Sequence, residues 1–348
     1  MHLTSIRRRT FTASMAAFAT SMAVPVLRAQ GRLERSKVSL VVDGEAALYH
    51  LPLTIADQLG YFKSEGLDLD ISDVVGGARS PQAVSGGPVD VYAGAFEQTL
   101  TLQARNQYFQ AFVLQCRAPQ IALGISIRSL PDYRTLADLK GKRIGVSALG
   151  SPGHTVANVV LARAGIHPGD VQFVAVGAAW IAVQALRSGQ IDAISNSDPV
   201  MAMLEQKGDI RVVADARTLR GTRDAMGGGM PAACLYAPLD YIQKNPNTVQ
   251  ALANGMVHGL KWLQTAGPSD IIKIVPESYF LGDRALYLAS FNKGREAISL
   301  DGMLAEDGAR LALKALGSFD VSMGNARIDL SKTYTNEFAR NAKERFKA

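Results

Sequence analysis

One short stretch, residues 49–71, limits more than any other what this chain can fold into. It reads YHLPLTIADQLGYFKSEGLDLDI. Pro52 suits the first turn of a helix, because the N–H that it lacks has no partner there. Apolar residues then recur at helical spacing up to Gly60, and residues 67–72 alternate between apolar and polar side chains after Gly66. The stretch therefore predicts a helix, a glycine turn and a half-buried strand, as in a βαβ unit.

The same alternation of strand and helix continues along the chain. We expect strands at 37–42, 67–75, 89–93, 111–116, 121–127, 144–147, 171–176, 191–195, 211–214 and 231–237. Helices are expected between them, at about 155–164, 178–186 and 199–206, and a mainly helical region follows residue 247. Alternating strands and helices predict an α/β fold, with mostly parallel sheets covered by helices on both faces.

The strand pattern restarts once, which predicts two lobes. We expect residues 121–127 to carry the chain out of the first lobe and residues 231–237 to carry it back. The predicted division is 36–122 with 232–348 for lobe 1, including the C-terminal helices, and 123–231 for lobe 2. A length of about 150 residues per domain is compatible with this division.

The first 29 residues have the pattern of an export signal. Arg7, Arg8 and Arg9 form a basic start with a twin-arginine character, an apolar run leads to Leu27, and Ala29 offers a cleavage point. The run is too short and too interrupted to favour a spanning helix, which needs about 20 apolar residues. We therefore expect a periplasmic protein. A plain secretory route and an uncleaved anchor are the alternatives.

Charge and cysteine content exclude several classes of function. The chain has 37 Lys and Arg against 31 Asp and Glu, but four of the arginines lie in the predicted signal. The small remaining excess, without a basic block, gives no indication of nucleic-acid binding. Cys116 and Cys234 lie in apolar runs, so buried free thiols are favoured over a disulfide. No motif for a metal site is present.

Two blocks of sequence carry a family resemblance. The first is "GYFKSEGLD" within residues 49–71, and the second is "DLKGKRIGVS…GSPGHT…LARAGIHPGDVQFVAVG…QALRSGQIDA" within residues 138–196. Together they resemble the periplasmic solute-binding proteins of nitrate, sulfonate, taurine and thiamine-precursor ABC importers. The resemblance implies the two-lobed periplasmic-binding-protein fold of type II, with a ligand cleft between the lobes.

Ligands of open α/β sheets bind outside the carboxyl ends of the strands, so the loops after the strands supply the candidate site. The loop 147–155 is the strongest candidate, because Ser151 can cap a helix whose first N–H groups then point at a ligand. The predicted ligand-binding residues are Glu45, Ala46, Tyr49, His50, Gly76, Gly77, Gly94, Phe96, Glu97, Ser147, Gly150, Ser151, Gly153, His154, Thr155, Trp180, Asn196, Asp198 and Gly229. Structural alternatives stay open for several: Phe96 as core, and the acids at positions 45, 97 and 198 as helix-start carboxylates.

The residue types at these loops favour an organic ligand. Three carboxylates (Glu45, Glu97 and Asp198) mix with backbone donors, and no lysine falls at a strand end. A zwitterion or a polar heteroaromatic suits this mixture better than a bare oxyanion. The family resemblance implies a solute-binding component of an ABC importer, which we expect to be a monomer. It would deliver a sulfonate- or taurine-like, aromatic-acid or pyrimidine-like solute to a permease, without a cofactor, metal or chemistry of its own.

Two alternatives come from the same residues. Residues 49–68 also resemble the pyrimidine synthase of thiamine biosynthesis, an enzyme on the same fold. That relative carries an active histidine in an "HTL" phrase, where this chain has Gln98-Thr99-Leu100, and a cysteine cluster, where this chain has only Cys234. A periplasmic sensory or interaction module is the third possibility.

Overall fold

The computed structural model describes residues 31–74 and 89–348. The chain divides into a short N-terminal unit, Met1–Gly31, and a compact unit, Arg32–Ala348. The export signal predicted for residues 1–29 lies outside the described residues, and so do Gly76 and Gly77. No helix in the described part of the chain is long and apolar enough to cross a membrane. All that follows concerns the compact unit.

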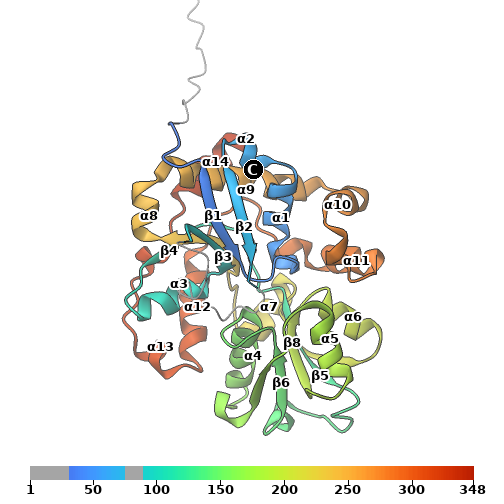
Figure 1. Cartoon of the computed structure of the whole chain (residues 1–348). Helices are drawn as coiled ribbons and strands as arrows, with labels where there is room; N and C mark the ends of the chain where they lie inside the picture. Colours follow the sequence, from blue (N-terminus) through green and yellow to red (C-terminus); the bar gives the residue numbers. More distant parts are fainter. Residues whose placement is uncertain (1–30, 75–88) are drawn as a thin grey trace, which may run out of the picture. The chain divides into compact units, whose positions relative to one another are not determined.

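Ten strands form two five-stranded sheets within this unit (Figure 1). The first sheet has the order β2-β1-β3-β10-β4, with β1 Lys37–Val42, β2 Asp68–Asp73, β3 Val91–Ala95, β4 Phe109–Leu114 and β10 Ala233–Pro238. The second sheet has the order β7-β6-β8-β5-β9, with β5 Ile121–Ser126, β6 Arg143–Val146, β7 Gln172–Ala175, β8 Ala193–Ser197 and β9 Ile210–Asp215.

Each sheet contains one strand that runs against the other four. In the first sheet it is β10, which pairs antiparallel with β3 and β4. In the second sheet it is β5, which pairs antiparallel with β8 and β9. These are the two strands that follow the crossings of the chain from one sheet to the other. The remaining strands are parallel, so their carboxyl ends lie on one edge of each sheet, as the α/β interpretation predicted.

Helices flank both sheets. With the first sheet lie α1 Leu51–Gln58, α2 Tyr61–Ser64, α3 Glu97–Ala104, α8 Leu239–Lys244, α9 Pro246–Thr265 and α14 Glu337–Phe346. With the second lie α4 Pro152–Arg163, α5 Ala179–Arg187, α6 Val200–Gln206 and α7 Leu219–Met226. The other helices are α10 Pro268–Ile274, α11 Arg284–Gly294, α12 Glu306–Gly317 and α13 Val321–Asn325. Six short 3-10 turns complete the described elements: η1 Leu48–His50, η3 Leu136–Leu139, η4 Pro168–Asp170, η5 Glu277–Phe280, η6 Arg295–Ala297 and η7 Leu330–Lys332.

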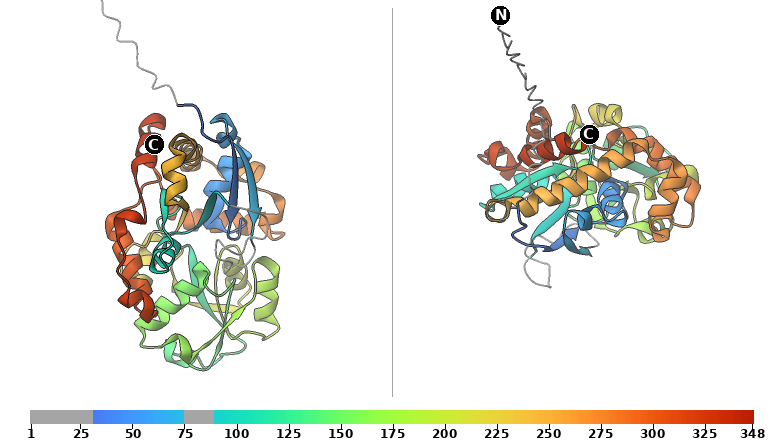
Figure 2. Two further views of the ribbon diagram at one scale, coloured as in Figure 1. Left: turned by 60° about the vertical axis from the view of Figure 1, so that its left-hand side comes forward. Right: turned by 90° about the horizontal axis from the view of Figure 1, so that it is seen from above.

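The stretch 49–71 is anchored by the long helix α9, which Figure 2 shows crossing over the first sheet beside α14. Phe62 of α2 is 2% exposed and packs on α9 at Gly255, where a Cβ atom would lie 2.5 Å from the Phe62 ring. Gly259, one turn later, lies against Ala56 of α1. Glycines therefore allow α9 to approach α1 and α2 closely, because they have no side chain to separate the helices.

Several predicted elements are shifted or extended in the structure. Strand β3 includes Gly94, which was expected in the loop after it. Helix α4 begins at Pro152 with Ser151 as its cap, which confirms the predicted capped start and extends the approximate range 155–164 towards the N-terminus. Helix α7 was not predicted. The C-terminal helices were expected to pack on lobe 1, but α11 also contacts α6 and α12 also contacts α4, so they also reach helices that flank the second sheet. Cys116 and Cys234 are buried free thiols, as predicted.

Candidate functional site

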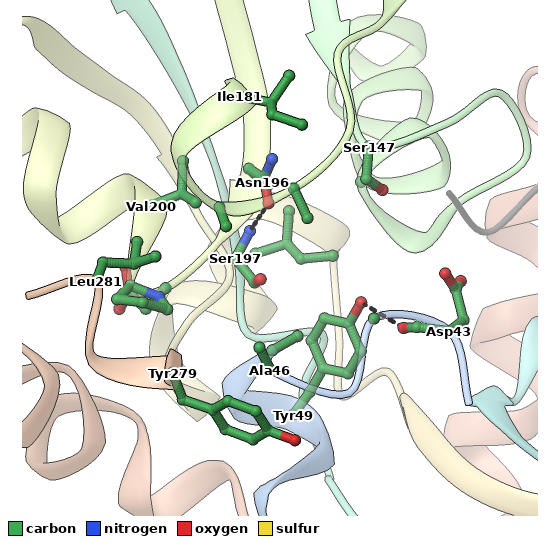
Figure 3. Close-up of a pocket in the computed structure, with 18 of the residues that line it drawn as sticks. Asp43, Ala46, Tyr49, Ser147, Ile181, Asn196, Ser197, Val200, Tyr279 and Leu281 are labelled. Carbon is green, nitrogen blue, oxygen red and sulfur yellow. Dashed lines mark hydrogen bonds between the residues drawn. The ribbon is translucent and has the colours of Figure 1, made fainter. Parts of the chain in front are cut away.

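A first cavity of about 290 Å³ lies between the carboxyl ends of strands from both sheets (Figure 3). The first-sheet region supplies the loop after β1, the end of β2 and a segment around η5. The second sheet supplies the end of β8 and the first residues of α4 and α5. Its described lining residues are Asp43, Gly44, Ala46, Ala47, Tyr49, Asp73, Ile121, Ser147, Gly153, Ala178, Ala179, Ile181, Ser195, Asn196, Ser197, Asp198, Pro199, Val200, Ser278, Tyr279 and Leu281.

The start of α4 is fixed against β8. The fully buried Ser151 caps the helix and accepts a hydrogen bond from the backbone N–H of His154, at 3.3 Å. Ser195 Oγ donates to the carbonyl oxygen of Gly153, at 2.8 Å. A Cβ atom at Gly153 would lie 2.6 Å from the Ser195 carbonyl oxygen, so glycine alone permits this approach. The positive end of the α4 dipole is thereby held at the cavity.

Helix α5 also begins at the cavity. No side chain caps its N-terminus, where Ala178 is the N-cap residue. Ala178, Ala179 and Ile181 line the cavity, and Ala179 has a positive φ of 54°. The first N–H groups of a helix have no partner within it, so this end presents backbone donors to whatever the cavity holds.

Asn196 adds a side-chain donor at the end of β8. It is 6% exposed, and its Oδ1 accepts a hydrogen bond from the Ser197 backbone N–H at 2.8 Å (Figure 3). Its Nδ2 is buried without a hydrogen-bond partner among the described residues. A buried, unpaired amide N–H is costly in a folded protein, so this group is suited to a partner that arrives with a ligand.

The first-sheet region contributes carboxylates. Asp43 and Asp73 line the cavity after β1 and at the end of β2. Burial raises the pKa of Asp73, and hydrogen bonds from the N–H groups of Glu45 and Gly44 oppose the shift. Tyr49 points into the cavity, and its hydroxyl donates a long hydrogen bond to the carbonyl oxygen of Asp43, at 3.5 Å (Figure 3). None of the described lining residues is Lys or Arg.

One wall of the cavity comes from η5, far along the chain. Tyr279 and Leu281 line it, and Leu281 has a positive φ of 48°. The pKa of the Tyr279 phenol is raised by burial and further by the neighbouring Glu45 carboxylate. Glu45 lines neither cavity of the cleft, and its place beside Tyr279 makes it a support for that wall.

Asp198 is tied to a buried arginine. Arg217, which is 1% exposed, follows β9 on the path back to the first sheet, and its Nη1 lies 3.1 Å from Asp198 Oδ1. Asp198 also caps α6 by accepting a hydrogen bond from the Ala202 backbone N–H. Burial raises the pKa of Asp198, and the Arg217 guanidinium opposes that shift. Arg217 further contacts Glu205 at 2.9 Å and Asp215 at 2.7 Å.

A second cavity of about 310 Å³ lies in the same cleft, and Asp43 lines both. Its described lining is Val41, Asp43, Val74, Tyr92, Ala93, Gly94, Ala95, Glu97, Gln98, Thr101, Leu102, Arg105, Leu149, Gly150, His154, Thr155, Tyr236, Leu316, Phe319 and Asp320. Gln98 Nε2 of α3 donates to the carbonyl oxygen of Gly150 before α4, at 3.1 Å. This hydrogen bond joins the first-sheet region to the second-sheet region beside the cavity.

The residues predicted to bind ligand are thus divided between two cavities. Ala46, Tyr49, Ser147, Gly153, Asn196 and Asp198 line the first, and Gly94, Glu97, Gly150, His154 and Thr155 line the second. Glu45, His50, Phe96, Ser151, Trp180 and Gly229 line neither. His50 and Phe96 are fully buried, whereas Trp180 is 45% exposed between two residues that line the first cavity.

Sequence reasoning missed Asp43, Asp73, Tyr279, Leu281 and Tyr236. The two aspartates stand where strands end. The rule that ligands bind at the carboxyl ends of strands in α/β sheets could therefore have indicated them. Tyr279 and Leu281 follow no strand and carried no signal. Among the described residues, no group of three or more His, Cys, Asp or Glu side chains could hold a metal ion.

The sequence model of the NMT1/THI5-like family matches residues 47–268, which is most of the chain. The chain belongs to the NMT1/THI5-like family. A solved structure of a Bordetella bronchiseptica RB50 protein is 51% identical, with a TM-score of 0.87, over 91% of this chain and 100% of that one.

Two more distant comparisons bear on this family member. The alkanesulfonate-binding protein SsuA of Xanthomonas axonopodis pv. citri, solved bound to MOPS, has a TM-score of 0.69 at 18% identity, over 87% of this chain and 99% of that one. This likeness shows the periplasmic-binding-protein fold. The 4-amino-5-hydroxymethyl-2-methylpyrimidine phosphate synthase of Schizosaccharomyces pombe is 25% identical over 226 residues, which are 63% of each chain. The match thus spans less than two thirds of that curated relative.

Proposed function

We propose that this protein is the solute-binding component of an ABC importer, and that it captures a small organic solute between its two sheets. The observation that carries the proposal is the first cavity, which both sheets line and whose lining includes Asn196, a residue with a buried Nδ2 that has no partner among the described residues. Two crossings join the sheets, which suits a hinge that closes on a ligand.

The two sides of the cavity favour a ligand with two different ends. The second-sheet side offers donors: Asn196 Nδ2 and the N-termini of α4 and α5. The first-sheet side offers the carboxylates of Asp43 and Asp73. A bare inorganic anion would satisfy the donors but would meet the carboxylates without a Lys or Arg among the described lining residues. A zwitterionic or amphoteric solute satisfies both sides.

The apolar walls favour an organic body between those ends. Tyr49, Tyr279, Ile181, Val200 and Leu281 face the same space. Their rings and methyl groups suit an aromatic or aliphatic body, as most small-molecule sites are largely apolar with a few oriented polar groups. A taurine- or sulfonate-like solute, an aromatic acid and a pyrimidine-like ring are the proposed classes. The fold shared with an alkanesulfonate-binding protein supports the first of these.

The proposed location and partner are those expected of a solute-binding protein of an ABC importer. We place the mature chain in the periplasm after removal of residues 1–29, acting as a monomer that delivers its solute to a membrane permease. Chemistry by the protein is not part of this function.

Trp180 offers a direct test, because it is one of only two tryptophans and stands at the edge of the first cavity. Titration with each proposed solute class should change the fluorescence of Trp180 and raise the melting temperature. Trp180→Phe is the matched control: it should lose the fluorescence change and keep the thermal shift. A fluorescence change without any thermal shift would count against ligand capture, and so would silence of both readouts across all classes.

A second candidate is a pyrimidine synthase-like enzyme, which the similarity to the Schizosaccharomyces pombe synthase favours. In the first cavity the described lining contains no His, Cys or Lys side chain, so the groups that most often act as base or nucleophile are not represented there. Formation of 4-amino-5-hydroxymethyl-2-methylpyrimidine phosphate by the purified protein would favour the enzyme over the binding protein.

A further inference from the structure

The second cavity contains a set of groups that the solute-binding proposal does not explain. Its lining includes Tyr92 of β3, Tyr236 of β10 and Glu97 at the start of α3, together with Asp43, which also lines the first cavity. We infer that this cavity binds the ammonium group of an organic cation, held by the carboxylates of Glu97 and Asp43 and by the phenol rings of Tyr92 and Tyr236. The inference deepens the proposed function and rests on it.

Glu97 is the central observation. It is 4% exposed and lines the cavity, yet its carboxylate accepts a hydrogen bond only from its own backbone N–H among the described residues. No Lys or Arg side chain is paired with it there. A carboxylate buried in this way is costly unless an opposite charge arrives, so a cationic ligand would supply the missing partner.

The aromatic lining suits the same group. The rings of Tyr92 and Tyr236 are stacked across neighbouring strands, with centroids 5.4 Å apart and an angle of 16° between their planes. Gly94 leaves room for the Tyr236 ring, because a Cβ atom there would make a tight contact of 3.3 Å with it. Phenol rings attract cations through their faces, and a phenol oxygen accepts from an ammonium N–H.

The charges around Glu97 decide the sign of the ligand. Among the described residues, the charges or dipoles of Asp43, Tyr49, Cys234 and Tyr236 act on Glu97, and the other titratable or charged groups that line the cavity are Tyr92, His154, Asp320 and Arg105. Arg105 is exposed at the rim, and burial lowers the pKa of His154, so this imidazole is neutral around neutral pH. The buried groups among these described residues are therefore acidic or neutral, which favours a positive charge on the ligand.

The same surroundings predict a pH dependence. Burial raises the pKa of Glu97 to about 7, its own N–H lowers it, and the charge of Asp43 raises it further. An ammonium ligand binds the ionised carboxylate more tightly than the neutral acid, so its affinity should rise with pH between 5.5 and 8, by up to about tenfold. Ligand binding should also release a proton near pH 7.

The test uses choline and ethanolamine as probes, with 3,3-dimethyl-1-butanol as the neutral isostere of choline. Saturation-transfer NMR on the full-length protein should detect at least one of the two cations at pH 8, with a weaker signal at pH 5.5, and no transfer to the isostere. Glu97→Gln keeps the shape and removes the charge, and it should weaken probe binding by about tenfold. Glu337→Gln on α14, outside both cavities, is the control and should leave binding unchanged.

Three results would overturn the inference. They are no transfer to either cation at pH 8, equal transfer to the neutral isostere, and undiminished binding by the Glu97→Gln variant. Tyr236→Leu gives a second variant that keeps the test valid if Glu97→Gln does not fold, and it should weaken choline binding in the same way. If the cations fail while a neutral or anionic solute changes Trp180 fluorescence, the ammonium inference is wrong and the proposed binding function stands.

Discussion

The buried guanidinium of Arg217 lies 3.1 Å from the carboxylate of Asp198, a residue that lines the first cavity. Arg217 also binds Asp215, whose second contact is Lys293 of α11 at 3.1 Å. A chain of charges therefore runs from the cavity, through the segment that returns to the first sheet, to a C-terminal helix. This network holds one edge of the cavity in place.

Replacement of Arg217 by Met should be strongly destabilising. It leaves Asp198 buried without its cation, and removal of one partner from a buried ion pair costs about 3–5 kcal/mol. Urea unfolding of the two proteins measures this difference. Arg220→Met is the control. The Arg220 side chain is 89% exposed and its ion pair with Asp224 is long, at 4.0 Å, so this change should alter stability by less than about 0.5 kcal/mol. A loss below about 1 kcal/mol in Arg217→Met would show that the network is not needed.

Asn196→Leu should separate binding from folding. The change removes the unpaired Nδ2 donor along with one hydrogen bond to Ser197, so stability without ligand should change by only about 1 kcal/mol. Solute affinity should fall by about tenfold or more, because the donor to the ligand is lost. Calorimetric titration and thermal unfolding measure the two effects, with the exposed Asn292→Leu as control. Equal affinity in Asn196→Leu and wild type would remove Asn196 from the site.

Gly153→Ala should disturb the same region through the backbone. The added methyl group would lie 2.6 Å from the Ser195 carbonyl oxygen, so the start of α4 must move. Overpacking of this kind typically costs about 1–3 kcal/mol, and we expect ligand affinity to fall with it. Gly169→Ala is the matched control, because no atom lies within 4 Å of its added Cβ. Similar stability in both variants would contradict the close approach of α4 and β8.

Glu97 should make stability depend on pH in the ligand-free protein. Its pKa is raised from 4.5 to about 7 in the folded state, so the folded state binds more protons than the unfolded state between these values. Stability should therefore fall as pH rises from 4.5 to 7, by about 3 kcal/mol in full. Glu97→Gln should remove that fall and be the more stable protein at pH 8. Parallel pH profiles of unfolding for both proteins would contradict the raised pKa.

Much of the fold was predictable because its signals are local. The stretch 49–71 carries helix spacing, a glycine turn and strand alternation, and the structure places α1, α2 and β2 there. Ser151, Pro152 and Gly153 form a recognisable helix start, which the structure confirms as the capped start of α4. Ser147 and Asn196 were predicted to bind ligand because they stand at the carboxyl ends of strands, and both line the first cavity in the structure.

The parts that could not be predicted depend on packing between distant segments. Tyr279 and Leu281 reach the cavity because η5 packs on α11, which in turn contacts α6, and no local pattern indicates this. Phe96 and His50 follow strands of the first sheet, as the lining residue Tyr49 does. Their side chains are nevertheless fully buried in the core. The direction of a side chain at a strand end is set by its neighbours, so the sequence pattern could not separate these residues from Tyr49.

Native mass spectrometry tests the central claim most directly. The wild-type protein and Asn196→Leu would be incubated side by side with a polar-metabolite extract of the source cells, then desalted and measured under the same conditions. We predict one small organic molecule per wild-type chain, released on denaturation, with at least a tenfold lower occupancy in Asn196→Leu. A wild-type chain that carries no bound mass, or equal occupancy in both proteins, would contradict solute capture in the first cavity.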